Sequence, residues 1–326
     1  MNIKYLCTYW GCEHLSAKSF LDLVIKNGYD GVEINFPDDA SFIEEFLSEL
    51  QTIRKSNHPK FIFVAQQVLP NRIETYESYV QRVSDRLQFL VSLGPNAINS
   101  HTGKDYFDFG ENSKILELTN QISKSSDIPI LHETHRGRFS FHAKTLLNYL
   151  DLFPNLKLVG DLSHFGVVSE SNLEDQETIL TKIFPKIKHI HARIGFEQSP
   201  QVNDPFAPEW NSYLERYLLW WKQIISIQEK KGLTEMFITP ECGPYPYMPE
   251  KPFSKEPLSN QWDNNIRMMQ YLQLNLFQMN NSKNITFIAL SAALGGLLFG
   301  YDTAVISGAI GNLTEFFHLS PVETGW

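Results

Sequence analysis

Cysteine and net positive charge are both scarce in this sequence. The 326 residues include three cysteines, Cys7, Cys12 and Cys242. They are too few and too scattered for a disulfide framework, and we expect a reducing, cytoplasmic setting. Lys and Arg number 28 against 37 Asp and Glu, which gives a net charge of −9. Because such a surface repels phosphate backbones, we expect no nucleic-acid partner.

Two sequence features are missing at the N-terminal end. Residues Met1–Leu6 run directly into a strand-like stretch and lack the pattern of a signal peptide. No glycine-rich turn follows the first predicted strand, Ile3–Tyr9. Such a turn is typical of dinucleotide-binding doubly wound sheets. Its absence makes that architecture the less favoured alternative.

Apolar strand-like runs alternate with amphipathic helical stretches from Ile3 to about Phe277. Eight strand–helix units over about 275 residues predict an α/β protein with a (β/α)8 TIM barrel. The predicted strands are Ile3–Tyr9, Gly31–Asn35, Lys60–Gln66, Ala97–His101, a run from Asp127 into Leu131, Leu156–Asp161, Ile187–Arg193 and Met236–Glu241. The predicted helices are Ser16–Asn27, Ala40–Ser56, Glu74–Leu93, Glu111–Ser125, one ending at Phe153, Leu173–Phe184, Trp210–Lys231 and Asn260–Phe277.

Polar groups stand where these predicted strands end. In a (β/α)8 barrel the carboxyl ends of the strands meet on one face. Three carboxylates and one imidazole among them suit Mn²⁺, Mg²⁺ or Co²⁺, with Zn²⁺ possible. Without a cation the carboxylates would repel one another and their pKa values would rise. We therefore expect one divalent metal ion, with the ligands Glu133, Asp161, His191 and Glu241.

The stretch Leu131–Arg138 carries the densest group of polar side chains. Burying so many polar groups is costly unless each finds a partner, which indicates a site. The arginines of this region could donate hydrogen bonds to hydroxyls, a carboxylate or a phosphate. The predicted substrate contacts are Arg136, Arg138 and Arg193, with His101 and Glu33 at the far end of the substrate.

Three histidines near these positions can be interpreted as structural or solvated rather than functional. His132 alternates with Glu133 and is expected to point away from the site. We expect the same of His189, beside His191. His135 could orient a carboxylate or could simply be solvated, and the sequence does not decide between the two.

The set of strand-end residues resembles the xylose-isomerase-like superfamily of sugar isomerases and epimerases, over about Ile3–Phe277. Gly160-Asp161-Leu162-Ser163-His164 is similar to that family's Asp-x-x-His element, and His189-Ile190-His191-Ala192-Arg193 to its strand with a metal histidine. The resemblance implies that His164 touches substrate or metal and that Arg193 lies near substrate. It also implies that Glu133 and Glu241 are metal ligands that act as an acid/base pair on a sugar or sugar phosphate, through a metal-stabilised enediolate. Members often form homo-oligomers.

Rival functions remain on the same fold. An inosose dehydratase-like lyase would use the same metal and base but expel water. An endonuclease IV-like apurinic endonuclease is less favoured, because Arg193–Glu197 lacks that family's Asp-x-His pair and Gln66-Gln67 stand where a further histidine is expected. A non-catalytic sugar-binding protein is the third alternative.

The C-terminal part has a different character. Residues 285–310 contain one charge, Asp302, and are long enough for a membrane span, which needs roughly 20 residues. The run Gly295–Ile310 resembles the first transmembrane helix of major-facilitator sugar transporters, in which the residue matching Asp302 is implicated in proton coupling. We expect a barrel over 1–278 and a transporter-like fragment over 279–326, joined from a neighbouring reading frame. The alternative is a genuine membrane anchor, which would make a cytoplasmic barrel membrane-associated.

Overall fold

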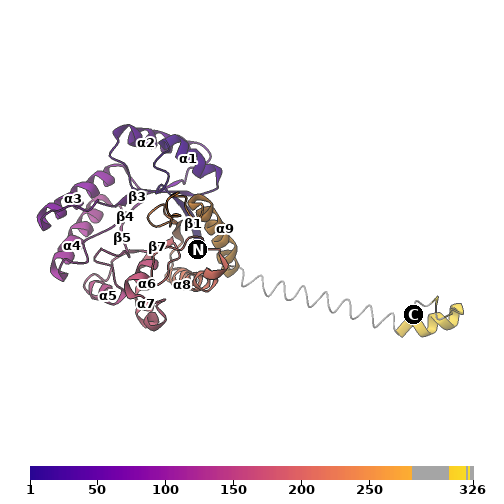
Figure 1. The fold of residues 1–326 in the computed structure, drawn as a ribbon. Coiled ribbons are helices and arrows are strands. Elements are labelled where there is room, and N and C mark those ends of the chain that lie inside the picture. The colour runs from indigo at the N-terminus through magenta and orange to yellow at the C-terminus, as the bar shows by residue number, and fades with distance from the viewer. Residues whose placement is uncertain (281–307, 321, 324–326) are drawn as a thin grey trace. The chain divides into compact units, whose positions relative to one another are not determined.

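The eight strands form a closed parallel barrel in which each strand pairs with its neighbour in sequence and β1 pairs with β8. Figure 1 shows the ring of strands with the helices around it. This computed structural model describes residues 1–280, 308–320 and 322–323. The predicted barrel is confirmed. Its strands are β1 Asn2–Thr8, β2 Gly31–Ile34, β3 Ile62–Gln67, β4 Ala97–Ser100, β5 Ile130–Glu133, β6 Leu158–Gly160, β7 Ile187–Ala192 and β8 Glu235–Pro240.

The helices begin and end within a few residues of their predicted limits, and the first has the predicted N-cap. The Ser16 hydroxyl accepts a hydrogen bond from the Ser19 N–H at 3.2 Å, which satisfies one free donor of the first turn. The helices outside the β6–β7 connection are α1 Ala17–Lys26, α2 Ala40–Lys55, α3 Tyr76–Ser92, α4 Phe109–Ser126, α5 Ala143–Leu152, α8 Asn211–Lys230, preceded by the 3₁₀ turn Pro208–Trp210, and α9 Gln261–Asn280.

The connection between β6 and β7 differs from the prediction of one helix over Leu173–Phe184. Leu173 has a φ of 61°, a left-handed conformation that does not continue a helix. The sequence instead forms α6, directly after β6, and then short helical pieces. These are α6 Ser163–Ser169, η1 Glu174–Gln176, α7 Glu177–Ile183 and η2 Phe184–Lys186.

An apolar layer closes the barrel below its carboxyl ends. Leu6, Val64, Ala97, Leu131 and Val159 are buried in one cluster. Because side chains alternate along a strand, the residue two positions later on each strand points into the same interior, one layer nearer the carboxyl ends. On β5 that step leads from Leu131 to Glu133. The apolar layer, called the floor below, therefore lies directly under the polar groups.

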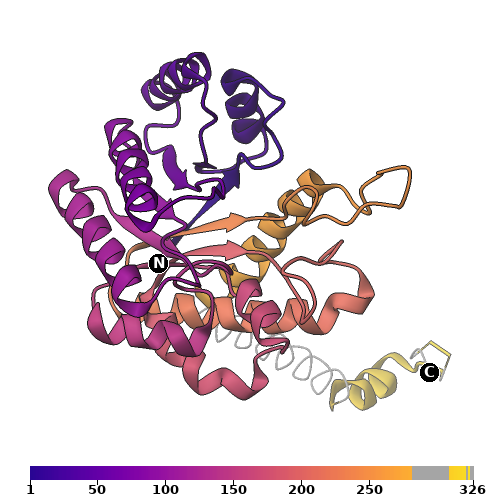
Figure 2. The same cartoon turned by 60° about the vertical axis from the view of Figure 1, so that its left-hand side comes forward.

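Long connections extend past the carboxyl ends of β7 and β8. Figure 2 shows them beyond the salmon and orange arrowheads. The connection after β8 brings the side chain of Tyr247 to a cavity at the barrel mouth.

The described chain forms two compact units, Met1–Gln270 and Tyr271–Trp326. Residues 308–317 of the second unit are helical. The predicted span 285–310 lies outside the described residues except for 308–310, and the boundary at 278 stays a prediction. Among the described residues, none of the helices combines the length and apolar character needed to cross a bilayer.

Candidate metal and sugar site

Four acid and imidazole side chains meet at the carboxyl ends of β5 to β8. One donor atom from each lies within 4.8 Å of the other three, and all four residues are buried. Neighbouring strands supply them because each occupies the inward position at the end of its strand. The structure thus brings together the complete predicted ligand set, Glu133, Asp161, His191 and Glu241.

His191 stands at the centre of this group. Its Nδ1 lies 2.8 Å from Glu241 Oε2 and 3.6 Å from Glu133 Oε2. Nevertheless, Nδ1 has no hydrogen bond of acceptable geometry to any described residue. An imidazole nitrogen this close to two carboxylate oxygens, without a hydrogen bond to either, is arranged as a metal ligand. Burial lowers the pKa of His191, but Glu241, Glu33 and Glu133 outweigh it and raise the pKa well above its ordinary value.

Glu33 holds the other side of the His191 ring. Both of its oxygens lie 3.0 Å from His191 Nε2. The Thr239 hydroxyl and the Asn99 amide also donate to it, at 2.6 and 2.9 Å. Burial alone would raise the pKa of Glu33, but His191, His189 and the Thr239 hydroxyl lower it to about 2. The carboxylate is fully buried, so these contacts favour a role in positioning His191, and the predicted substrate contact stays a prediction.

Asn99 links two acids and was missed by the sequence reasoning. Its amide nitrogen donates to Glu33 at 2.9 Å and to Glu133 at 2.7 Å. His101 Nε2 lies 2.9 Å from the same Glu133 oxygen. Burial would raise the pKa of Glu133, but His101 and His191 hold it well below its ordinary value. The available signal was a polar residue directly after the short apolar run Ala97–Ile98.

Arg193 is already paired within the cluster. Its guanidinium contacts Asp161 Oδ2, lies 2.9 Å from His164 Nε2 and stands 3.7 Å from Glu241. Asp161 Oδ1 accepts from both the N–H and the hydroxyl of Ser163. Burial lowers the pKa of His164, and His135 and the Arg193 guanidinium add to that effect. A neutral His164 is therefore expected beside Arg193.

A cavity of about 470 Å³ opens onto this cluster. Glu133, Glu241 and Arg193 line it together with Trp10 and Tyr247. The Arg193 guanidinium carbon lies 4.7 Å from the Tyr247 ring centroid and 5.8 Å from that of Trp10. The volume is in the range of small-molecule sites, and aromatic faces are suitable for packing against a sugar ring.

Backbone room for Trp10 comes from a single glycine after β8. A Cβ on Gly243 would stand 2.1 Å from the indole atom Cη2 of Trp10, far inside contact distance. The absence of a side chain at 243 therefore lets the indole reach the cavity wall. Neither Trp10 nor Gly243 is among the predicted site residues.

The loop after β5 carries the predicted histidine and arginines. Burial lowers the pKa of His135. The centroid of its ring lies 3.8 Å from that of the His164 ring and 4.5 Å from that of the His101 ring. His135 Nδ1 lies 2.5 Å from the Arg136 carbonyl. His135 and Arg138 line the cavity, and the Arg136 guanidinium carbon lies 5.1 Å from the Tyr247 ring centroid. His135 is therefore held by the loop rather than freely solvated.

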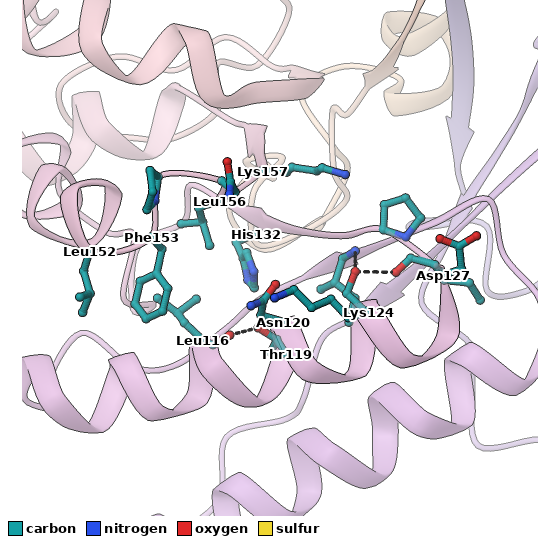
Figure 3. A pocket seen from close by; sticks show the side chains of 16 residues that line it. Leu116, Thr119, Asn120, Lys124, Asp127, His132, Leu152, Phe153, Leu156 and Lys157 are labelled. Carbon is teal, nitrogen blue, oxygen red and sulfur yellow. Dashed lines mark hydrogen bonds between the residues drawn. The ribbon is translucent and has the colours of Figure 1, made fainter.

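The orientation expected for His189 was wrong, and that for His132 was right. His189 lies two residues from His191, so both point into the barrel, and His189 Nε2 meets Thr239 Oγ1 at 2.8 Å. His132 faces the helical layer, where Nδ1 meets Thr102 Oγ1 at 2.7 Å. Figure 3 shows His132 in a second cavity, of about 430 Å³, beside Thr119 of α4 and the loops before β5 and β6. In barrels of this kind the catalytic side chains come from the opposite, carboxyl-end face.

The donor set fits a divalent ion. Donor atoms about 2.0–2.2 Å from an ion stand about 3 Å apart when adjacent and about 4.3 Å apart when opposite, in keeping with the measured separations. Burial raises the pKa of Glu241, and the charge of Glu133 adds to the rise. A cation would remove that repulsion. Two other trios of described residues could also hold an ion, Glu33–His189–His191 and His101–Glu133–His135.

Solved structures with the same fold include sugar-active proteins and metal-bound ones. A D-tagatose 3-epimerase-like protein superposes with a TM-score of 0.58 at 14% identity, over 85% of this chain and 98% of its own. The IOLI protein with a bound zinc atom gives 0.56 at 17% identity, over 82% and 96%. A xylose isomerase-like TIM barrel protein from Mycobacterium smegmatis in complex with magnesium gives 0.52 at 13%, over 84% and 97%. At these identities the likeness shows the TIM-barrel fold alone.

Curated relatives match only a short segment, and no family model matches the chain. The arabinose-proton symporter of Bacillus subtilis is 58% identical over 41 residues, 13% of this chain and 9% of the symporter. The D-xylose-proton symporter of Escherichia coli K12 is 62% identical over 37 residues, 11% and 8% of the two chains. This chain therefore spans less than a tenth of the length of these two relatives.

Proposed function

We propose that the barrel is a divalent-metal-dependent isomerase or epimerase of a sugar or sugar derivative. The observation that carries the proposal is the buried quartet Glu133, Asp161, His191 and Glu241, with the unbonded His191 Nδ1 facing two carboxylates. The xylose-isomerase-like fold and the aromatic cavity above the quartet support it. An ion held there would stabilise the negative charge that develops on a substrate oxygen when the neighbouring carbon loses a proton.

Glu133 and Glu241 are the proposed proton carriers. Both line the cavity, so a substrate seated there would meet both. Asn99 and His101 hold one oxygen of Glu133, which fixes the direction of that carboxylate. A proton taken by one glutamate and returned by the other inverts a carbon, whereas return to the adjacent carbon isomerises the sugar.

Glu33 is proposed to position the ligand histidine. Because it occupies His191 Nε2, it selects the tautomer with the proton on that nitrogen and leaves the Nδ1 lone pair for an ion. His189 and Gln66 stand beside Glu33, with Nε2 atoms 3.4 and 3.2 Å from its oxygens. The chain of contacts gives the ring a fixed orientation before an ion arrives.

The direct test is hydrogen exchange at carbon. The full chain loaded with Mn²⁺ is incubated in D₂O with a panel of ketoses, ketose phosphates, keto sugar acids and inososes, and NMR follows deuterium entering next to the carbonyl. We expect exchange with at least one member, and at least a hundredfold slower exchange in Glu133→Gln and Glu241→Gln, as is typical for the loss of an acid/base group.

Glu117→Gln is the matched control, since Glu117 is exposed on α4. Exchange that survives in both site variants would contradict the proposal, as would no exchange with any of the sugars. Deuterium exchange accompanied by loss of water would instead identify the dehydratase-like lyase.

A further inference from the structure

The turn after β5 presents two guanidinium groups that have no acidic partner. The Arg138 N–H donates to the His135 carbonyl at 3.3 Å, and Gly137 takes a φ of 73°, which glycine adopts readily. Arg136 and Arg138 thereby leave the two sides of a tight turn. Within the described part of the chain, neither lies within 4.0 Å of an Asp or Glu oxygen.

Arg138 is the better placed of the two for a ligand. It lines the cavity that also contains Glu133 and Glu241. Its Nη1 donates to the Gly137 carbonyl at 3.1 Å, and its buried Nε has no hydrogen-bond partner among the described residues. A buried N–H without an acceptor costs about 1–3 kcal/mol, more when it is charged. An acceptor brought by a ligand would remove that cost.

Lys104 is a second cation near Arg138. Lys104 is 7% exposed, with Nζ donating to Asn71 at 2.8 Å and standing 5.4 Å from the Tyr79 ring centroid. Burial lowers its pKa, and the charge of Arg138 adds to that effect. The acid Glu74 acts on Lys104 in the opposite sense but is already paired with Arg82. Asp105 also raises the pKa of Lys104, but neither Lys104 nor Arg138 forms an ion pair with an acid among the described residues.

Most of the negative charge on the acids of the site is offset without Arg138 and Lys104. Arg193 and a divalent ion offset all but one of the four charges on Glu33, Glu133, Asp161 and Glu241. The remaining acid on the cavity wall, Glu13, is exposed and accepts from the Gly11 N–H at 2.8 Å. Positive charge is therefore left over on the Arg138 side of the cavity.

We propose that Arg138, with Arg136 beside it, binds an anionic group of the substrate, so that the natural substrate is a sugar phosphate or a sugar acid and not a neutral sugar. A guanidinium can donate paired N–H hydrogen bonds to a phosphate or to a carboxylate. The positive charge of Lys104 adds to the attraction without contacting the ligand. The inference rests on the proposed function of the same cavity. It separates the substrate into a reacting end at Glu133 and Glu241 and an anchoring end at Arg138.

The test uses three ketoses that differ only at carbon 6: D-fructose, D-fructose 6-phosphate and D-fructuronate. Binding to the Mn²⁺-loaded full chain is measured by calorimetry. We expect at least one anion to bind about tenfold or more tightly than fructose, the equivalent of one charge-assisted hydrogen bond. Preference for the ester identifies a phosphate subsite, and preference for the acid a carboxylate subsite.

Arg138→Gln should abolish the preference while Mn²⁺ content stays unchanged. Arg138→Lys retains the charge and should keep part of the preference, which also guards against a misfolded variant. Arg216→Gln, which removes the surface ion pair with Glu177, is the matched control and should behave as the unaltered chain. Equal affinity for the three ketoses, or no binding of either anion, would overturn the subsite while leaving the metal site intact. Failure to take up Mn²⁺ would instead count against the proposed function itself.

Discussion

His191 and His132 are both buried, and they lie in opposite surroundings. His191 is inside the barrel mouth, between Glu33 and Glu241, and its pKa is raised well above the ordinary value. His132 faces outward beside α4, and burial lowers its pKa to about 3. The same side chain is thus surrounded by acids in one layer and by apolar groups and hydroxyls in the other. Burial of a histidine side chain alone does not identify a functional site, whereas burial among several acids whose charges are not neutralised does.

The largest effect is expected from removing the central imidazole. His191→Ala should abolish stoichiometric binding of Co²⁺ or Mn²⁺, because it deletes the one nitrogen donor among the four ligands. Competition against a chelator, together with the visible spectrum of Co²⁺, measures this directly. His58→Ala, at an exposed position, is the control. Binding that persists in His191→Ala would place the ion elsewhere.

The floor below the acids should matter for stability and not for the metal. Leu131→Ala removes a buried side chain from the apolar layer and should lower the free energy of unfolding by about 2–5 kcal/mol. Metal affinity at 4 °C should change little, since Leu131 is not a ligand. Urea titration and metal titration of the same sample separate the two properties. Equal losses in both would erase the distinction between floor and site.

A smaller effect is expected at Glu33. Glu33→Gln should weaken metal affinity about 10–100-fold, as is typical when the partner of a ligand histidine is lost. The pKa of His191 in the metal-free protein, followed by imidazole ¹⁵N chemical shifts, should fall in Glu33→Gln, because Glu33 is one of the acids that raise it. Glu33→Asp, which keeps the charge, should recover part of the affinity. An unchanged pKa together with unchanged metal affinity would favour the originally predicted contact of Glu33 with substrate.

The smallest effect is the acid response of the outer layer. Because the pKa of His132 is about 3 when folded and about 6.5 when unfolded, the unfolded chain binds more protons between these values. This histidine therefore makes the fold less stable as pH falls below 6.5, by about 1 kcal/mol from pH 6 to pH 5. Urea unfolding at both values should show that loss reduced in His132→Gln and retained in His58→Gln. An equal loss in all three proteins would mean that His132 has no part in it.

The barrel was predictable because each strand carries its own pattern. Apolar runs that end in polar residues recur eight times, and parallel strands bring those ends together without any further information. The four ligands Glu133, Asp161, His191 and Glu241 follow from that rule alone, since each is an inward residue at a strand end.

Contacts between non-adjacent strands were beyond this rule. Glu33 of β2 reaches His191 of β7 across the barrel, and Asn99 joins Glu33 to Glu133. Strand order gives no such distances. The error at His189 was of another kind, because period-two alternation already places it on the same face as His191. Arg193 is held by Asp161, a pairing that depends on side-chain reach, and its expected contact with substrate stays a prediction.

Anomalous diffraction from crystals of the full chain grown with Mn²⁺ or Zn²⁺ tests the central claim most directly. We predict one peak per chain, about 2.0–2.3 Å from His191 Nδ1 and from carboxylate oxygens of Glu133, Asp161 and Glu241. A peak at Glu33 and His189, a peak at His101 and His135, or no peak at the barrel mouth would contradict the assignment of these four residues as the metal site.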